Sequence, residues 1–167
     1  NLTNSIVTGN TALASGSGNI NGQGGGIFST GPLNVTNCTI TGNTGAGANS
    51  SGGIRTDKLI LRSTIVAGNT GTSGAAADLS AQDPGSFATQ GYNLIGNNTQ
   101  CVMTPNIGDQ LNVNPKLGFM VGFPGYLPLA PDSPALNAGN PETPGSGGTA
   151  CLANDERGVS RPVGGRC

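Results

Sequence analysis

The sequence predicts an all-β protein, specifically a right-handed parallel β-helix (solenoid) of about four rungs that ends in an irregular cap rich in proline and glycine. Three observations favour this fold class. The composition is poor in helix-forming and aromatic residues, apolar residues alternate with polar ones, and a short motif recurs at the intervals of a solenoid.

The composition argues against a helical fold and against several classes of partner. The 167 residues include 30 glycines and no tryptophan or histidine, and only 9% are charged. Asn, Thr and Ser compete with helical hydrogen bonding, and glycine lacks a β-carbon. The net charge is −1 with scattered basic residues, so we expect no nucleic-acid partner. No apolar run reaches the ~18–20 residues that cross a bilayer, so we expect no membrane span in this chain.

The recurring motif is a strand-like apolar segment that ends in Gly-Asn. Its asparagines lie 26 to 33 residues apart and are Asn10, Asn43, Asn69 and Asn97. A Gly-Gly-Ile motif at 25–27 and again at 52–54 precedes the next Gly-Asn by a similar distance. Asparagine tolerates left-handed backbone and can hydrogen-bond the equivalent side chain above and below, so we predict a structural turn ladder rather than a ligand site. The Gly-Gly pairs predict tight corners with positive φ.

Apolar residues alternate within each unit, which is the two-residue period of a strand with one buried face. One coil of such strands buries little surface alone and needs a neighbour about 4.8 Å away to pair with. The predicted inward ladder consists of Val7, Ile40, Val66, Val35 and Leu61, and Leu94 is its weakest candidate. Ser5, Cys38 and Thr64 are predicted to form a smaller row.

The repeat stops near residue 100, where proline becomes frequent. We therefore divide the chain into rungs at 1–100 and a capping, anchor-proximal region at 101–167. Because residue 1 lies inside a repeat, we expect the chain to be the mature or truncated C-terminal part of something longer. Leu2 and Val7 on this open rung are candidate self-assembly edges.

Particular motifs carry a family resemblance. The Gly-Gly-Ile and Gly-Asn units resemble the repeats of polymorphic outer-membrane-protein-type β-helices. The segments 91–96, 114–118, 131–139 and 155–162 are similar to the end of large bacterial extracellular proteins with a so-called choice-of-anchor domain. The resemblance covers nearly the whole chain, and it implies a β-helix located outside the cell or on the bacterial surface.

Four cysteines in an extracellular chain permit two disulfides. Cys151 and Cys167 bracket an Asp-Glu-Arg-Gly segment and are the predicted pair. Cys38 is predicted to be a small core residue, and Cys101 has no assigned partner. Zinc is a poor alternative, since the chain has no histidine and no Cys-x-x-Cys.

Catalytic residues are hard to find in this sequence. Polysaccharide lyases and hydrolases with this fold need paired carboxylates, or a calcium cluster with a base. None of the eight acids recurs at one repeat position, and the only charged cluster in the rungs, Arg55, Asp57, Lys58 and Arg62, fits a solvated corner and strand face better than a lyase site. We predict no catalytic residue, no metal site and no cofactor.

Calcium is the one ion considered, because Asp109, Asn112 and Asn114 offer oxygen ligands, although their irregular spacing matches no defined loop. The expected function is that of an extracellular structural or adhesive β-solenoid, such as a surface stalk, sheath or filament subunit that assembles end to end. The expected partners are further copies of the chain, another cell-surface protein or a polysaccharide. The alternative is the C-terminal part of a carbohydrate-active β-helix enzyme, a polysaccharide lyase or hydrolase.

Overall fold

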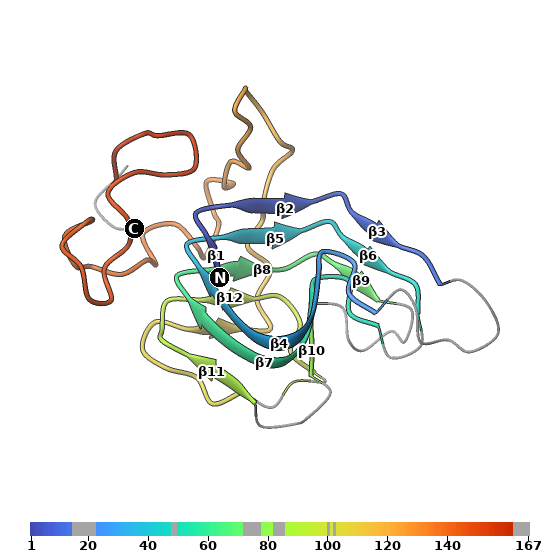
Figure 1. Cartoon of the computed structure of the whole chain (residues 1–167). Coiled ribbons are helices and arrows are strands. Elements are labelled where there is room, and N and C mark those ends of the chain that lie inside the picture. Colours follow the sequence, from blue (N-terminus) through green and yellow to red (C-terminus); the bar gives the residue numbers. More distant parts are fainter. Residues whose placement is uncertain are drawn as a thin grey trace.

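The computed structural model describes residues 1–14, 23–47, 50–71, 78–81, 86–99, 101 and 103–161. Within these residues every regular element is a β-strand, and no helix is long and apolar enough to cross a membrane. The named strands pair in parallel throughout. The all-β prediction is therefore confirmed, and the arrangement is compatible with a β-solenoid (Figure 1).

The described strands form three sheets, which together we call the sheet stack. The first sheet contains β1 (Leu2–Thr3), β4 (Ile27–Thr36), β7 (Ile54–Arg62), β10 (Leu79–Ala81) and β11 (Phe87–Thr89). The middle sheet contains β2 (Ile6–Thr8), β5 (Thr39–Thr41), β8 (Ile65–Val66), β12 (Leu94–Ile95) and β13 (Gln110–Leu111). The last sheet contains β3 (Thr11–Ala12), β6 (Thr44–Gly45) and β9 (Thr70–Gly71). Figure 1 shows β2, β5, β8 and β12 stacked one above the other.

The core lies between the sheets and is built from rows of aliphatic side chains in register. In the middle sheet the inward row consists of Val7, Ile40, Val66, Ile95 and Leu111. In the first sheet the strands place Leu2, Val35 and Leu61 in one row. Of the predicted inward residues, Ile40, Val66, Val35 and Leu61 are fully buried, whereas Val7 is half-buried against the core. Burying such aliphatic side chains contributes roughly 1.5–3 kcal/mol each.

Leu94 lies one position away from its predicted place. It pairs with Ile65, and Ile95 pairs with Val66. The cause is a missing residue, since the fourth unit reads Leu94-Ile95-Gly96-Asn97 where the third reads Ile65-Val66-Ala67-Gly68-Asn69. Alignment on Gly-Asn therefore shifts the apolar residues by one.

The glycines that have positive φ at the corners are those of the Gly-Asn motif and not, as the sequence had predicted, those of the Gly-Gly pairs. Gly9, Gly42 and Gly68 take the positive φ, at 70°, 65° and 72°, so the glycine rather than the following asparagine adopts the left-handed conformation. The Gly-Gly pairs do not have positive φ. They are needed for close approach instead, because a Cβ on Gly52 would lie 2.3 Å from the backbone nitrogen of Thr70.

The tail differs from the sheet stack in having only isolated bridges between its described residues, such as Leu117 with Leu129 and Asn154 with Ser160. The stack itself continues past the predicted boundary at residue 100, because β13 pairs with β12. The hairpin at 117–129 projects from the sheets, and the remaining tail lies beside the corner that joins the first and middle sheets (Figure 1).

Candidate binding cavity and the polar ladders

The repeat asparagines form a hydrogen-bonded ladder that runs through the sheet stack. The backbone N–H and the Nδ2 of Asn10 both donate to Oδ1 of Asn43, at 3.0 and 2.9 Å. Asn43 donates to Oδ1 of Asn69 in the same way, at 3.1 and 2.9 Å. Asn43 is fully buried, so these contacts satisfy polar groups that water does not reach. The ladder is a structural device with no free oxygen at Asn43.

Asp78, rather than Asn97, continues the ladder after Asn69. The N–H and Nδ2 of Asn69 donate to Oδ1 of Asp78 at 3.0 and 2.8 Å. Asn97 instead accepts hydrogen bonds from Thr99 in a local turn, and its backbone N–H donates to the Asp78 carboxylate. Burial raises the pKa of Asp78, and the hydrogen bonds from Asn69 and Asn97 oppose that rise. We call the series Asn10, Asn43, Asn69 and Asp78 the asparagine ladder.

A second ladder follows the corner between the first and middle sheets. The N–H of Cys38 donates to Oγ1 of Thr64 at 3.3 Å, and the N–H of Thr64 donates to Oδ1 of Asn93 at 3.0 Å. The N–H and Nδ2 of Asn93 both donate to Oδ1 of Asp109 at 2.9 Å. This series again ends on a carboxylate, which accepts hydrogen bonds and has no proton to donate when ionised.

The oxygens considered for calcium already accept hydrogen bonds from the protein. The second oxygen of Asp109 accepts from Thr89 and from the N–H of Asn106. Asn112 accepts from the N–H of Asn98, and Asn114 from that of Lys116. Among the described residues there is no group of three or more His, Cys, Asp or Glu side chains arranged to hold a metal ion. A cavity of about 400 Å³ beside Asp78 is lined by these same engaged amides.

The four residues that turn the corner ahead of the middle-sheet strands all have left-handed backbone. They are Asn4, Asn37, Ser63 and Tyr92, with φ of 52°, 53°, 47° and 58°. Each donates its backbone N–H to a carbonyl of the next coil, so the four residues stack. Asparagine tolerates this conformation better than most residues, which explains its use at two of the four positions.

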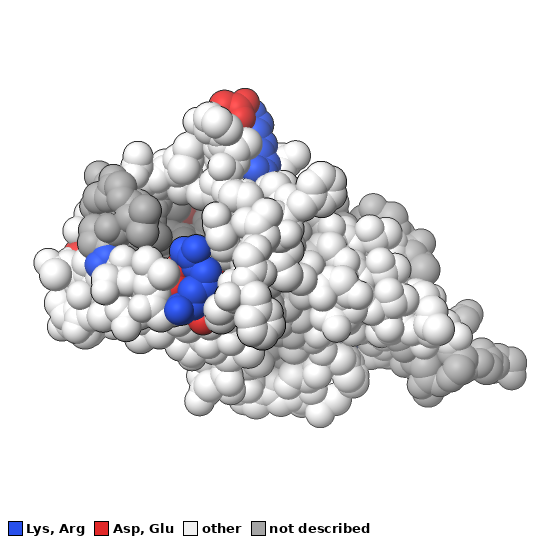
Figure 2. All heavy atoms as spheres, turned by 90° about the horizontal axis from the view of Figure 1, so that it is seen from above, with Lys and Arg blue, Asp and Glu red and all other residues white. Residues whose placement is uncertain are grey.

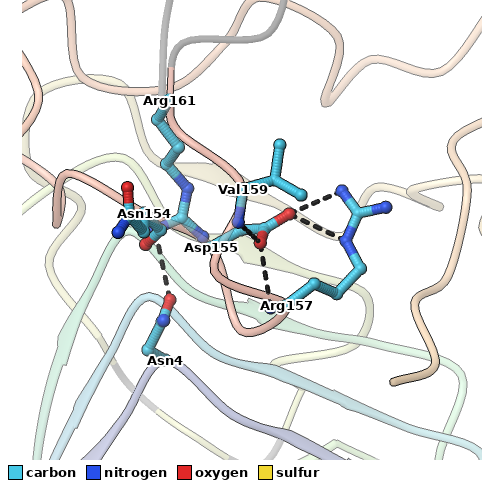
Figure 3. A network of polar contacts seen from close by, with 6 residues as sticks. All are labelled: Asn4, Asn154, Asp155, Arg157, Val159 and Arg161. Atoms are coloured by element: carbon cyan, nitrogen blue, oxygen red, sulfur yellow. Dashed lines mark hydrogen bonds and ion pairs between the residues drawn. The ribbon is translucent and has the colours of Figure 1, made fainter. Parts of the chain in front are cut away.

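The tail packs against this corner through Arg161. Its Nη1 donates to Oδ1 of Asn4 at 3.2 Å and to the backbone oxygen of Asn154 at 2.9 Å (Figure 3). The loop that carries Arg161 is held by Asp155, which accepts from Nε of Arg157 and from the N–H of Val159, both at 2.9 Å. A residue 157 positions later in the chain is thereby attached to the first coil.

Between the tail and the corner lies a cavity of about 170 Å³, which we call the corner cavity. One wall is the outward row of the middle sheet, in which Ile6, Thr39, Ile65, Leu94 and Gln110 stand in register. The facing tail residues include Leu129, Ala135, Ala138, Glu156 and Arg161. Most of these residues are half-buried, so solvent reaches the cavity.

Two corner residues that line the cavity carry buried polar atoms without a partner. Neither Oδ1 nor Nδ2 of Asn37 makes a hydrogen bond, although only 8% of the residue is exposed. The hydroxyl of Ser63, one coil further on, is also without a partner. Leaving such groups unmet costs ~1–3 kcal/mol each. These atoms distinguish the corner cavity from the satisfied ladders on either side of it.

The charged cluster on β7 differs from the solvated surface that we expected. Arg55 is only 9% exposed and donates to Gln23 and Ser80. Arg62 donates to the carbonyl of Gly148 in the tail at 2.6 Å. The Arg55 guanidinium is therefore held inside the fold, where it binds β7 to neighbouring segments. Elsewhere, Figure 2 shows a face that is largely uncharged, with few Lys, Arg, Asp or Glu side chains.

Two of the four cysteines are free and buried, namely Cys38 and Cys101. Cys38 belongs to the core cluster, and burial raises the pKa of its thiol. Burial raises the pKa of Cys101 to about 12. Cys151 is buried, but Cys167 lies outside the described residues, so the pairing of these two stays a prediction.

The candidate assembly edge is formed by β1, β2 and β3. β2 is the terminal strand of the middle sheet within the described residues, and Leu2 and Val7 pack against the core from this edge while remaining half-buried. The corner cavity is lined by four residues for which the sequence indicated only structural rows, namely Ser5, Cys38, Thr64 and Leu94. The sequence signal that could have located the cavity was the row of Ser5, Cys38 and Thr64. The residues just before them, Asn4, Asn37 and Ser63, turn the corner beside it.

Comparisons with family models, with curated proteins and with solved structures found no match for this chain. The resemblance to surface-protein repeats therefore remains a prediction, and the function must be argued from the site itself.

Proposed function

We propose that this chain is a non-enzymatic structural and adhesive protein of the bacterial cell surface or exterior. Its scaffold in this proposal is a right-handed parallel β-helix of about four rungs, and it serves as part of a stalk, sheath or filament. One observation carries the proposal. The side-chain amides in the two ladders hydrogen-bond one coil to the next, and a carboxylate accepts the last hydrogen bonds of each ladder.

Carboxylates are the groups that polysaccharide-cleaving β-helices need for chemistry. Here Asp78 and Asp109 each accept two hydrogen bonds from a ladder asparagine. Asp132 pairs with Lys116, and Asp155 pairs with Arg157. Four of the eight acids thus already have hydrogen-bond or ion-pair partners within the chain, which favours a scaffold over a catalyst.

The edge of β1, β2 and β3 supports the assembly part of the proposal. In the part of the chain that the structure describes, β1, β2 and β3 have no strand on their outer side, and such edges with half-buried apolar residues such as Leu2 offer hydrogen bonds and apolar rows to a further coil. That coil belongs either to a longer form of the same chain or to another copy, and assembly in solution distinguishes the two. The net charge of only −1 keeps the electrostatic repulsion between copies low.

The test is negative-stain microscopy of the purified 167-residue chain over a range of concentrations. We expect regular fibres that grow with concentration. Leu2→Lys should suppress them, because it places a charge among the apolar residues of the edge. Thr3→Lys, on the exposed face of the same strand, is the matched control and should leave fibres intact.

Isolated particles at every concentration would overturn the assembly part of the proposal. Depolymerisation of pectin-like or alginate-like polymers by the purified chain would overturn the structural part and favour the enzyme.

A further inference from the structure

We propose that the corner cavity is a binding site for a single neutral sugar ring, present either as a free monosaccharide or as the end of a glycan. This inference rests on the adhesive function proposed above and assigns it to a defined site. The unmet polar atoms, the apolar wall, and the charge and size of the cavity all restrict the ligand.

The amide of Asn37 is the strongest indication of a ligand. Buried side-chain amides in folded proteins nearly always have hydrogen-bond partners. Asn37 has none at either polar atom, and Ser63 above the same cavity has none at its hydroxyl. An amide presents a donor and an acceptor side by side, and neighbouring sugar hydroxyls each donate and accept. Two adjacent hydroxyls would satisfy both atoms of Asn37 together once the side chain turns toward the cavity, because both atoms are shielded from solvent in the structure.

The middle-sheet wall of the cavity is largely apolar and fits the apolar face of a sugar ring. Ile65 and Leu94 stand in the outward row, and Leu129 faces them from the tail. Tyr92 lines the same cavity. Small-molecule sites are commonly apolar with a few placed polar groups. A pyranose has this division, since its C–H groups form an apolar face and its hydroxyls form a polar edge.

Charge and size restrict the ligand further. The two ionisable groups of opposite sign in the lining are Glu156 and Arg161, so their formal charges cancel and a neutral ligand is favoured. The cavity of about 170 Å³ is smaller than the pockets that hold drug-sized ligands. It has room for roughly five to six water molecules at ~30 Å³ each. That volume accommodates one sugar ring rather than an extended oligosaccharide.

The test is titration of the isotope-labelled 167-residue chain with D-glucose, D-galactose, D-mannose and N-acetyl-D-glucosamine, followed by NMR. We expect at least one of them to shift the side-chain amide signals of Asn37 and the backbone signals of Thr39 and Ile65. The corresponding methyl glycosides imitate a chain end. Tighter binding of the methyl glycoside indicates a glycan terminus, and tighter binding of the free sugar indicates a monosaccharide.

The informative variant is Asn37→Gly, because glycine accepts the φ of 53° and removes the amide. It should weaken binding about tenfold, the loss expected for two hydrogen bonds to a buried amide. Asn137→Gly is the matched control, since Asn137 has a φ of 54°, is exposed and does not line the cavity. Ser63→Ala is a second variant, and thermal unfolding of each variant verifies that it folds.

Absence of binding by all four sugars and their glycosides would overturn the proposal and mean that water alone occupies the cavity. Binding that Asn37→Gly and Ser63→Ala both leave unchanged would overturn it too, by placing the site elsewhere. Fibre formation is measured separately, so a chain that forms fibres and binds no sugar disproves this site while retaining the proposed scaffold function.

Discussion

An asparagine inside the ladder makes more hydrogen bonds than one at its end. Asn43 accepts from Asn10 and donates to Asn69, and its Nδ2 also lies 2.9 Å from the carbonyl oxygen of Val7. Asn10 is exposed and has the ladder on one side only within the described residues. The contribution of each asparagine to stability therefore depends on whether it lies inside the ladder or at its exposed end.

Asn43→Ala should lower the free energy of unfolding by about 2–4 kcal/mol, because it leaves buried groups on both neighbouring coils unpaired. Asn10→Ala should cost less than about 1 kcal/mol, since water replaces the lost partner. Urea denaturation of both variants measures the difference. Equal losses of unfolding free energy at the two positions would contradict the idea that burial determines how much each ladder asparagine stabilises the fold.

Asp78 makes stability depend on pH in a defined direction. Its pKa is raised in the folded chain, chiefly by burial, so the folded state holds the proton to higher pH than the unfolded state. The unfolded carboxyl ionises near pH ~3.9. The contribution of Asp78 to stability is therefore fully present below that pH and is lost as pH rises through the folded pKa.

The comparison that isolates this effect is wild type against Asp78→Asn. The unfolding free energy of the wild type, relative to the variant, should fall as pH rises above about 4. Denaturation series at several pH values check this, and titrations elsewhere in the chain cancel in the difference. A difference that stays constant or grows with pH would show that Asp78 is not destabilised by burial.

At this scale the sequence revealed the asparagines of the ladder but not its end. Asn10, Asn43 and Asn69 share a motif, whereas Asp78 follows Asn69 by only nine residues. Its register explains it, since Leu79 pairs with Ile54 and Asp78 therefore stands opposite Gly53. Asp78 and Leu79 thus occupy the positions of Gly53 and Ile54 in the Gly-Gly-Ile motif of the preceding coil. Their distance in sequence from that motif was the signal available.

At the scale of the elements, close packing between corners sets the need for glycine. The Gly-Gly motif leads into β4 and into β7, and each first glycine lies against the backbone of the last sheet. A Cβ on Gly25 would come within 2.5 Å of the carbonyl carbon of Thr44. Backbone atoms cannot yield as a flexible side chain does, so the corner has no room for alanine.

Gly52→Ala should therefore destabilise the protein by at least about 3 kcal/mol, or prevent the last sheet from forming. Gly31→Ala is the matched control, because Gly31 lies within β4 and a Cβ there meets nothing within 4 Å. It should change stability by less than about 0.5 kcal/mol. Thermal unfolding followed by circular dichroism measures both, and a tolerated Gly52→Ala would show that the corner relaxes.

Strand positions were largely predictable because the two-residue period is local. The alternation at 33–35 and 59–61 identified parts of β4 and β7. Register was harder where a unit lost a residue, as the shift at Leu94 shows. The role of the Gly-Gly pairs was also missed, because close approach depends on a coil that the local sequence does not describe.

At the scale of the whole molecule, the tail gives the stack a second layer on one side. It covers the outward row of the middle sheet and attaches to the first coil through Arg161. Only the tip of its hairpin stands free, with Phe119 and Phe123 94% and 101% exposed, because the Arg157 guanidinium lies over the Tyr126 ring of the same hairpin. Nothing in the repeat pattern predicts where an irregular, proline-rich segment lies, so this arrangement and the corner cavity were not foreseen.

The exposed hairpin and the core should respond differently to the same change. Phe123→Ser should leave the free energy of unfolding within about 0.5 kcal/mol and reduce any self-association, because the ring is exposed. Phe87→Ser, at a residue only 7% exposed in the core, should cost about 3 kcal/mol or more. Chemical denaturation and sedimentation velocity measure the two effects. A large stability loss in Phe123→Ser would mean that the tip of the hairpin packs onto the protein.

The carboxylates at the ends of the two ladders also determine how such a protein can lengthen by duplication. A copied unit inserted before Asn69 adds an amide that both accepts and donates, so the series continues. A unit added beyond Asp78 meets a carboxyl group that accepts from both sides and, when ionised, passes no donor onward. The aspartate acts as a stop in a one-way chain, so new repeats are expected to accumulate on the Asn10 side.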